Sequence, residues 1–331
     1  WHLGSRDEQH PNNRGFDLFY GMKAGGRDYF YNEKKSDRPG DERNLLLNDR
    51  QVKFEKYLTD AFSEKAVEFI NESSQPFMMY LAYNAVHTPM QATDEDMAKF
   101  EGHPRQKLAA MTYALDRGVG TVIRGLKDSG KFDNTLIFFL SDNGGATTNQ
   151  SSNYPLKGFK GNKFEGGHRV PYFVVWKNGI PAGKPYDGLV SSLDIFATAI
   201  DAASISKTRN RLDGVSLLPY LKGKKGEPHK VLYWRKMDTR AIRSGDYKLI
   251  ITHGVDSVLY NIRRDPEEMN NLINKEPDLY RKLAKKLAKW EKNECIEPSW
   301  LEEGWRKITN RYHQQLMHNE IKTAQDLYKK K

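Results

Sequence analysis

The feature that most constrains the fold is an apolar segment that ends in a polar, glycine-containing turn. Residues 135–140 read Thr-Leu-Ile-Phe-Phe-Leu, a short run that predicts a buried strand and not a helix. The sequence Ser141-Asp142-Asn143-Gly144-Gly145 follows at once. Ligand sites of α/β proteins lie just beyond the carboxyl ends of strands, and side-chain oxygens suit a hard cation. The turn is therefore a candidate cation site, with an ordinary Asx-type turn as the alternative.

The order of the expected elements indicates two kinds of structure along the chain. Helices and strands alternate up to about residue 203, which indicates a βαβ architecture with a largely parallel sheet. After a basic, glycine-containing linker at 222–226, short strands separated by turns indicate a small antiparallel α+β subdomain. Periodicity predicts helices at 56–71, 105–128, 192–203 and 277–292, and strands at 77–83, 135–140, 170–176, 231–234, 240–243, 247–252 and 258–261.

These patterns predict three segments in a chain of 331 residues. Residues 1–222 are expected to form a catalytic domain, residues 223–295 the antiparallel α+β subdomain, and residues 296–331 a polar extension. No apolar run reaches roughly 18 residues, so no membrane span is expected. The net charge is +10, but many lysines lie in the last third, where a solvated helix face explains them. Since no nucleic-acid-binding motif accompanies the charge, a nucleic-acid partner is not expected.

Polar residues form four clusters that are candidates for one active site. Two histidines, a lysine and an oxygen-bound cation suit the hydrolysis of an anionic ester. The cation and the lysine would neutralise negative charge, and the histidines would move protons. A phosphate-binding Gly-Lys-Ser/Thr loop and a His-Glu-x-x-His zinc motif do not occur. The clusters are Trp1-His2-Leu3-Gly4, His87-Thr88-Pro89, Ser141-Asp142-Asn143-Gly144 and the segment 157–167.

In this order and spacing the clusters resemble the type I sulfatases, the formylglycine-dependent, calcium-binding, arylsulfatase-like family. The resemblance covers Trp1 to about Leu272. It implies an α/β fold, the alkaline-phosphatase-like sandwich with a largely parallel central sheet flanked by helices, plus a small C-terminal α+β subdomain with an antiparallel sheet. Further segments that carry the resemblance are Glu165-Gly166-Gly167-His168-Arg169-Val170-Pro171, residues 241–249, Leu259-Tyr260-Asn261 and Asp265-Pro266-Glu267-Glu268.

The resemblance implies catalytic roles for two histidines and a lysine. His2 matches the histidine that acts as a base beside the formylglycine. His87 matches the histidine that binds the sulfate and protonates the leaving oxygen. Lys160 matches the lysine that bridges the sulfate and the leaving oxygen, and Lys157 and Lys163 lie close enough in sequence to be alternatives.

The resemblance also implies a Ca²⁺ site for which Asp142 and Asn143 would supply two ligands. The family nucleophile lies in Cys/Ser-x-Pro/Ala-x-Arg, and residues 1–331 contain no such sequence. The single cysteine, in Cys295-Ile296-Glu297-Pro298-Ser299, has its proline one position late and no arginine after it. The formylglycine and the other calcium ligands are therefore expected upstream of Trp1. The chain is expected to be an N-terminally truncated sulfatase fragment without activity of its own.

The implied function is that of a sulfatase, a sulfuric ester hydrolase acting on a sulfated sugar or an aryl sulfate. The implied partner is the formylglycine-generating enzyme or another sulfatase-maturating enzyme, and the habit of the family is a periplasmic or secreted location. Two alternatives remain: a phosphoester hydrolase of the same superfold, and a non-catalytic relative that binds sulfated glycans. The aromatic residues Phe16, Tyr20 and 29–31 are candidates for a sugar subsite or for simple packing.

Overall fold

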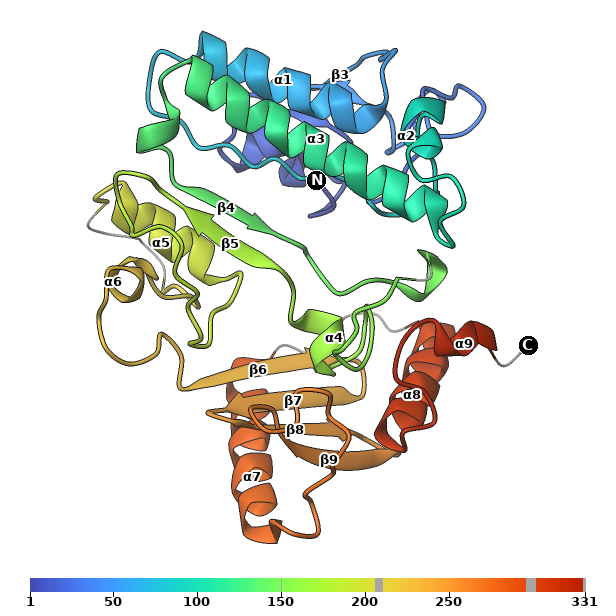
Figure 1. Cartoon of the computed structure of the whole chain (residues 1–331), viewed down its shortest axis with the longest axis vertical. Coiled ribbons are helices and arrows are strands. Elements are labelled where there is room, and N and C mark those ends of the chain that lie inside the picture. The colour runs from blue at the N-terminus through green and yellow to red at the C-terminus, as the bar shows by residue number, and fades with distance from the viewer. Residues whose placement is uncertain (150, 206–210, 296–301, 330–331) are drawn as a thin grey trace. The chain divides into compact units, whose positions relative to one another are not determined.

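The computed structural model describes residues 1–149, 151–205, 211–295 and 302–329, which form two compact units, Trp1–Asp133 and Asn134–Lys331 (Figure 1). These units follow contacts within the chain. The division at residues 222 and 295 rests on composition and remains a prediction. No helix in the described ranges is long and apolar enough to cross a membrane.

The first unit is organised around two helices that pack side by side, α1 (Leu58–Glu72) and α3 (Gln106–Asp128) (Figure 1). Both confirm the helices predicted from periodicity. Phe62 of α1 and Met111 of α3 belong to one buried cluster, and Arg117 of α3 forms ion pairs with Asp60 and Asp96. The other elements are η1 (Asp7–Gln9), η2 (Pro11–Arg14), β1 (Tyr20–Gly21), β2 (Leu46–Leu47), β3 (Arg50–Gln51) and α2 (Asp94–Ala98), with β1–β2–β3 forming an antiparallel sheet. The short helix η3 (Phe132–Asn134) spans the boundary between the two units.

The strand predicted at 77–83 is absent from this part of the structure, and the prediction is wrong there. Its side chains do alternate in exposure, and Met78 and Tyr80 are 65% and 55% exposed. A strand, however, is defined by the hydrogen bonds of its partner, and no described strand pairs with these residues. The pattern of apolar residues shows which side chains alternate between two faces, but it does not show whether a partner strand is present.

In the second unit, β4 (Ile137–Leu140) and β5 (Tyr172–Val175) confirm two predicted strands, with shorter bounds. They pair antiparallel, with Ile137 opposite Val175 and Leu140 opposite Tyr172. The described strands include no parallel pair, so the parallel pairing expected from helix–strand alternation is not seen among them. Alternation indicates the types of element but does not fix which strands become neighbours.

The C-terminal antiparallel sheet confirms its prediction in strand number and order. Its strands are β6 (Val231–Lys236), β7 (Thr239–Ser244), β8 (Tyr247–Thr252) and β9 (Asp256–Asn261). Because side chains alternate along a strand, Ile242 and Leu249 pack against α7 (Pro277–Glu294), whereas Ala241 and Ile250 pack in the core that contains Leu316 of α8 (Glu303–Met317). The remaining elements are η4 (Thr147–Asn149), α4 (Glu165–His168), α5 (Asp194–Ala202), α6 (Leu218–Leu221) and α9 (Asp326–Lys329).

Candidate active site

Within the first unit, His2 and His87 both lie against the dipeptide Gly25-Gly26. A methyl group added at Gly25 would lie 2.5 Å from Cε1 of His2, which leaves no room for a side chain there. One added at Gly26 would lie 3.6 Å from Nδ1 of His87. Both histidines are exposed. The structure therefore brings the two predicted histidines of this unit to one accessible stretch of bare backbone.

The imidazole of His87 is oriented by its own loop. Its Nδ1 lies 2.7 Å from the carbonyl oxygen of Thr88. Because a carbonyl only accepts hydrogen bonds, Nδ1 carries the hydrogen, and Nε2 is the unprotonated nitrogen of the neutral ring. Nε2 is then the atom that can exchange a proton with a bound molecule.

The buried side chain of Tyr29 supports the loop that carries His87. Its Oη lies 2.7 Å from the carbonyl oxygen of Asn84 and 2.9 Å from that of His87. Its ring is 0% exposed and stacks on Tyr57 at 5.3 Å. Burial raises the pKa of Tyr29, followed in size by the effect of Tyr57, so the hydroxyl stays a donor at neutral pH. Of the aromatic residues considered for a sugar subsite, Tyr29 is therefore a packing residue.

Replacing Tyr29 by phenylalanine should lower the free energy of unfolding by about 0.5–1.5 kcal/mol, because the carbonyl oxygens of Asn84 and His87 lose the buried hydroxyl that they share. Urea denaturation of chain 1–331, followed by fluorescence, measures this loss. Tyr80 is the control, since its ring is 55% exposed and Tyr80→Phe removes a hydroxyl that water can replace. Equal losses in the two variants would contradict the role given to Tyr29.

In the second unit, Asp142 and Asn143 follow β4 in a hydrogen-bonded turn. The backbone N–H and the side-chain Nδ2 of Asn143 donate to Oδ1 of Asp142 at 2.9 and 3.0 Å. Asp142 is exposed and, within the described ranges, has no cationic partner. Its Oδ2 and the Oδ1 of Asn143 accept no hydrogen bond from described residues. These two oxygens fit a hard cation, although Ca²⁺ takes roughly six to eight.

The turn after β4 is bound to the loop that carries Lys160. The backbone N–H of Lys160 donates to the carbonyl oxygen of Gly145 at 3.0 Å, and that of Gly144 donates to Gly167 at 3.1 Å. A methyl group at Gly144 would lie 1.8 Å from the carbonyl oxygen of Gly166, so the two backbones meet where no side chain fits. Asp142, Asn143 and Lys160 therefore lie on neighbouring loops of this unit.

The three lysines considered for substrate binding have different surroundings. Lys157 is fully buried, and its Nζ donates to the carbonyl oxygen of Glu268 at 3.0 Å and to Oδ1 of Asn319 at 2.5 Å. It is therefore a structural residue. Burial, together with nearby lysines, lowers the pKa of Lys163 to about 8. Lys160 is exposed, which suits contact with a substrate.

A buried charge cluster fixes α4, which follows the Lys160 loop, to the C-terminal sheet. Nζ of Lys248 lies 2.8 Å from Glu165 and 3.0 Å from Glu268. Burial raises the pKa of Glu268 against the attraction of Lys248. Burial also acts to raise the pKa of Glu165, but Lys248 and its other cationic neighbours hold that pKa below its usual range. The sequence places both glutamates in motifs of the family but does not reveal that one lysine joins them.

Within the described ranges, no group of three or more His, Cys, Asp or Glu side chains could hold a metal. A different feature of the site did not emerge from the sequence. Basic residues of the first unit gather around a cavity beside His87, which the positive charge of the whole chain does not reveal. The only signal in the sequence is the recurrence of basic residues between positions 23 and 43.

Comparison with known proteins defines first the fold and then the family. The crystal structure of Ps i-CgsB superposes with a TM-score of 0.84 at 35% identity, over 97% of this chain and 76% of that one. This likeness confirms the alkaline-phosphatase-like α/β fold. The sulfatase family model matches residues 1–205, and the model of the N-sulphoglucosamine sulphohydrolase C-terminal region matches residues 160–293. The chain belongs to the sulfatase family, as its motifs indicate.

Two curated relatives fix the extent of the match. The uncharacterized sulfatase YdeN of Escherichia coli (strain K12) is 38% identical over 240 residues, which are 70% of this chain and 41% of that protein. The N-acetylgalactosamine-6-sulfatase of Canis lupus familiaris is 30% identical over 263 residues, 75% of this chain and 50% of that protein. The chain spans about half the length of the curated relatives it matches.

Proposed function

We propose that the protein to which these residues belong is a sulfuric ester hydrolase that removes sulfate from a sulfated sugar. The observation that carries the proposal is the pair of exposed histidines, His2 and His87, against Gly25-Gly26 in a member of the sulfatase family. Exposed imidazoles beside backbone without side chains give an anionic ester room to approach two groups that can give or take a proton.

Each predicted residue has a role in this proposal. The imidazolium form of His87 protonates the leaving oxygen through Nε2–H and becomes the neutral ring, since Nδ1–H stays with the carbonyl of Thr88. His2 is the base in the step that releases sulfate, and the ammonium of Lys160 pairs with a sulfate oxygen and the leaving oxygen.

Asp142 and Asn143 are two ligands of a Ca²⁺ ion in the proposed site. When bound, the ion supplies positive charge to the sulfate oxygens. The nucleophile is a formylglycine outside residues 1–331, made by the formylglycine-generating enzyme or another sulfatase-maturating enzyme. A periplasmic or secreted location belongs to the same proposal.

Names and titles of relatives support a sugar sulfate as the substrate. Ps i-CgsB has been crystallised with k-i-k-neocarrahexaose, at 34% identity and a TM-score of 0.83. The canine relative is named for sulfate at position 6 of N-acetylgalactosamine. We therefore propose a sulfated glycan, or a sulfated sugar derived from one, over a simple aryl sulfate.

The test uses a protein that joins residues 1–331 to a Cys/Ser-x-Pro/Ala-x-Arg segment and is produced with a maturating enzyme. We expect it to release 4-nitrophenol from the sulfate ester and much less from the phosphate ester, and chain 1–331 alone to release none. A preference for the phosphate ester would identify a phosphoester hydrolase. Sulfated-glycan binding without turnover would identify a non-catalytic relative.

A further inference from the structure

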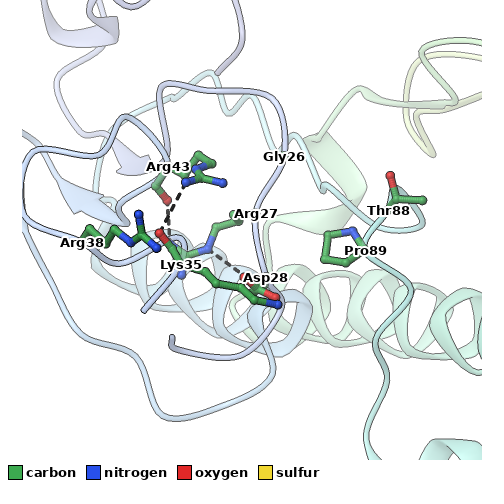
Figure 2. Close-up of a pocket in the computed structure, with 8 residues that line it drawn as sticks. All are labelled: Gly26, Arg27, Asp28, Lys35, Arg38, Arg43, Thr88 and Pro89. Atoms are coloured by element: carbon green, nitrogen blue, oxygen red, sulfur yellow. Dashed lines mark hydrogen bonds between the residues drawn. The ribbon is translucent and has the colours of Figure 1, made fainter. Parts of the chain in front are cut away.

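A cavity of about 550 Å³ opens in the first unit next to the loop that carries His87. Figure 2 shows basic side chains on one wall and Thr88 and Pro89 on the opposite one. The proposed chemistry needs a place for one sulfate, and it gives no role to this cavity. The residues that line it are Gly26, Arg27, Asp28, Lys35, Arg38, Arg43, Thr88 and Pro89.

Two of the four basic side chains that line the cavity are paired with carboxylates. Arg27 is buried, and its guanidinium makes hydrogen bonds of 2.8 and 2.7 Å to the two carboxylate oxygens of Asp37. Arg43 forms the same kind of pair with Asp41, at 2.8 and 2.6 Å. Paired in this way, these two arginines shape the cavity more than they attract an anion.

The other two basic side chains, Lys35 and Arg38, are exposed and form no ion pair within the described ranges. Arg38 donates through Nε to the carbonyl oxygen of Lys34, and its charge acts on Asp41 without forming an ion pair with it. The carboxylate of Asp28, also in the lining, accepts hydrogen bonds from Gln91 at 2.7 Å and Ser36 at 3.2 Å. With Asp37 and Asp41 included, four cations face three carboxylates, so the lining remains positive.

The cavity begins at the residue that touches His87. A methyl group at Gly26 would lie 3.6 Å from Nδ1 of His87 and 3.8 Å from the carbonyl oxygen of Thr88, and both Gly26 and Thr88 line the cavity. If the sulfate of a glycan lies at His87, the substituents next to that sulfate therefore lie at the entrance of the positively charged cavity.

We infer that this cavity binds a second anionic substituent of the substrate, so that the enzyme selects glycans that carry another negative charge close to the cleaved sulfate ester. The inference rests on the proposed function. Lys35 and Arg38 supply the attraction, and the paired arginines keep the walls in place. The substituent is a sulfate or a carboxylate, since both accept charge-assisted hydrogen bonds from lysine and arginine.

The test compares three substrates of the matured protein: a monosulfated disaccharide, the same disaccharide with a second sulfate, and the same disaccharide with a carboxylate instead. We expect kcat/KM to be higher for one or both dianionic substrates. In the double variant Lys35→Met, Arg38→Met this preference should fall by about tenfold, mainly through KM, because about two charge-assisted contacts are lost. Added salt should reduce the wild-type preference, since the two side chains are exposed. Lys107→Met, which removes an exposed charge from α3, is the control.

Failure of this inference differs from failure of the proposed function. Turnover of the monosulfated substrate without a dianionic preference, or with a preference that the double variant keeps, would overturn the cavity as a subsite and leave the sulfatase intact. If no sulfate ester is cleaved, calorimetric titration of chain 1–331 with the dianionic disaccharides decides. Equal affinities of the wild type and the double variant would overturn the inference.

Discussion

His87→Ala should lower kcat for a sugar sulfate by about two orders of magnitude or more, the usual scale for a group that transfers a proton. A sugar alkoxide is a poor leaving group and needs the proton that Nε2 supplies. The loss should therefore be smaller for 4-nitrophenyl sulfate, whose phenolate leaves readily without help. Steady-state kinetics of the matured protein with both substrates measures the two losses.

The difference between the substrates separates a catalytic histidine from a structural one. Damage to the fold would lower both activities alike, whereas a lost proton donor affects the poor leaving group more. His103→Ala is the control, because His103 is exposed in a turn where its Nδ1 accepts a hydrogen bond from the backbone of Arg105. Equal losses on both substrates would remove His87 from the proton-transfer step.

Lys248→Met should lower the free energy of unfolding by about 3–5 kcal/mol, because it leaves two buried carboxylates without their shared cation. Glu165 and Glu268 would then repel each other at the base of α4. The loss should be larger near pH 8 than near pH 5. Without the ammonium the pKa values of both carboxyls rise from their values in the wild type, so protonation at low pH relieves the repulsion. Urea denaturation of chain 1–331 at both pH values measures the effect.

Two further variants test whether the loss of stability in Lys248→Met comes from the buried charges. Lys285→Met removes an exposed charge from α7 and should change the unfolding free energy little. The triple variant Lys248→Met, Glu165→Gln, Glu268→Gln should recover part of the loss, since its buried groups carry no charge. A loss in Lys248→Met below about 1 kcal/mol, the scale of an exposed ion pair, would contradict the buried cluster.

The elements that could be predicted from the sequence are those whose hydrophobic pattern lies within the element itself. The apolar stripe of α3 and the alternation in β6–β9 fix both the type of element and its buried face, and the structure confirms them. The segment 77–83 has the same kind of alternation, but the described structure gives it no partner strand. The antiparallel pairing of β4 with β5 likewise depends on how distant segments meet, which periodicity does not encode.

The predicted site residues came from the family resemblance, and their convergence on one sulfate remains a prediction. Spacing left Lys157 and Lys160 nearly equivalent. The structure distinguishes them because Lys157 contacts Glu268 and Asn319, which lie 111 and 162 residues further along the chain. The cavity was missed for a related reason. The charge of its lining depends on which arginines form ion pairs with a carboxylate. The net charge of the whole chain does not contain that information.

The contact between Lys157 and Asn319 bears on how this protein is best handled. The same region adds a hydrogen bond of 2.8 Å from the backbone of Gly158 to the carbonyl oxygen of Lys322, three residues before the loop reaches Gly161. Affinity tags and fusion partners are commonly attached behind the last helix of a domain. Here such an attachment would disturb the contacts of Asn319 and Lys322 that hold the Lys160 loop. The hairpin turn at Gly245 has open space around it, so a label placed there should disturb the structure less.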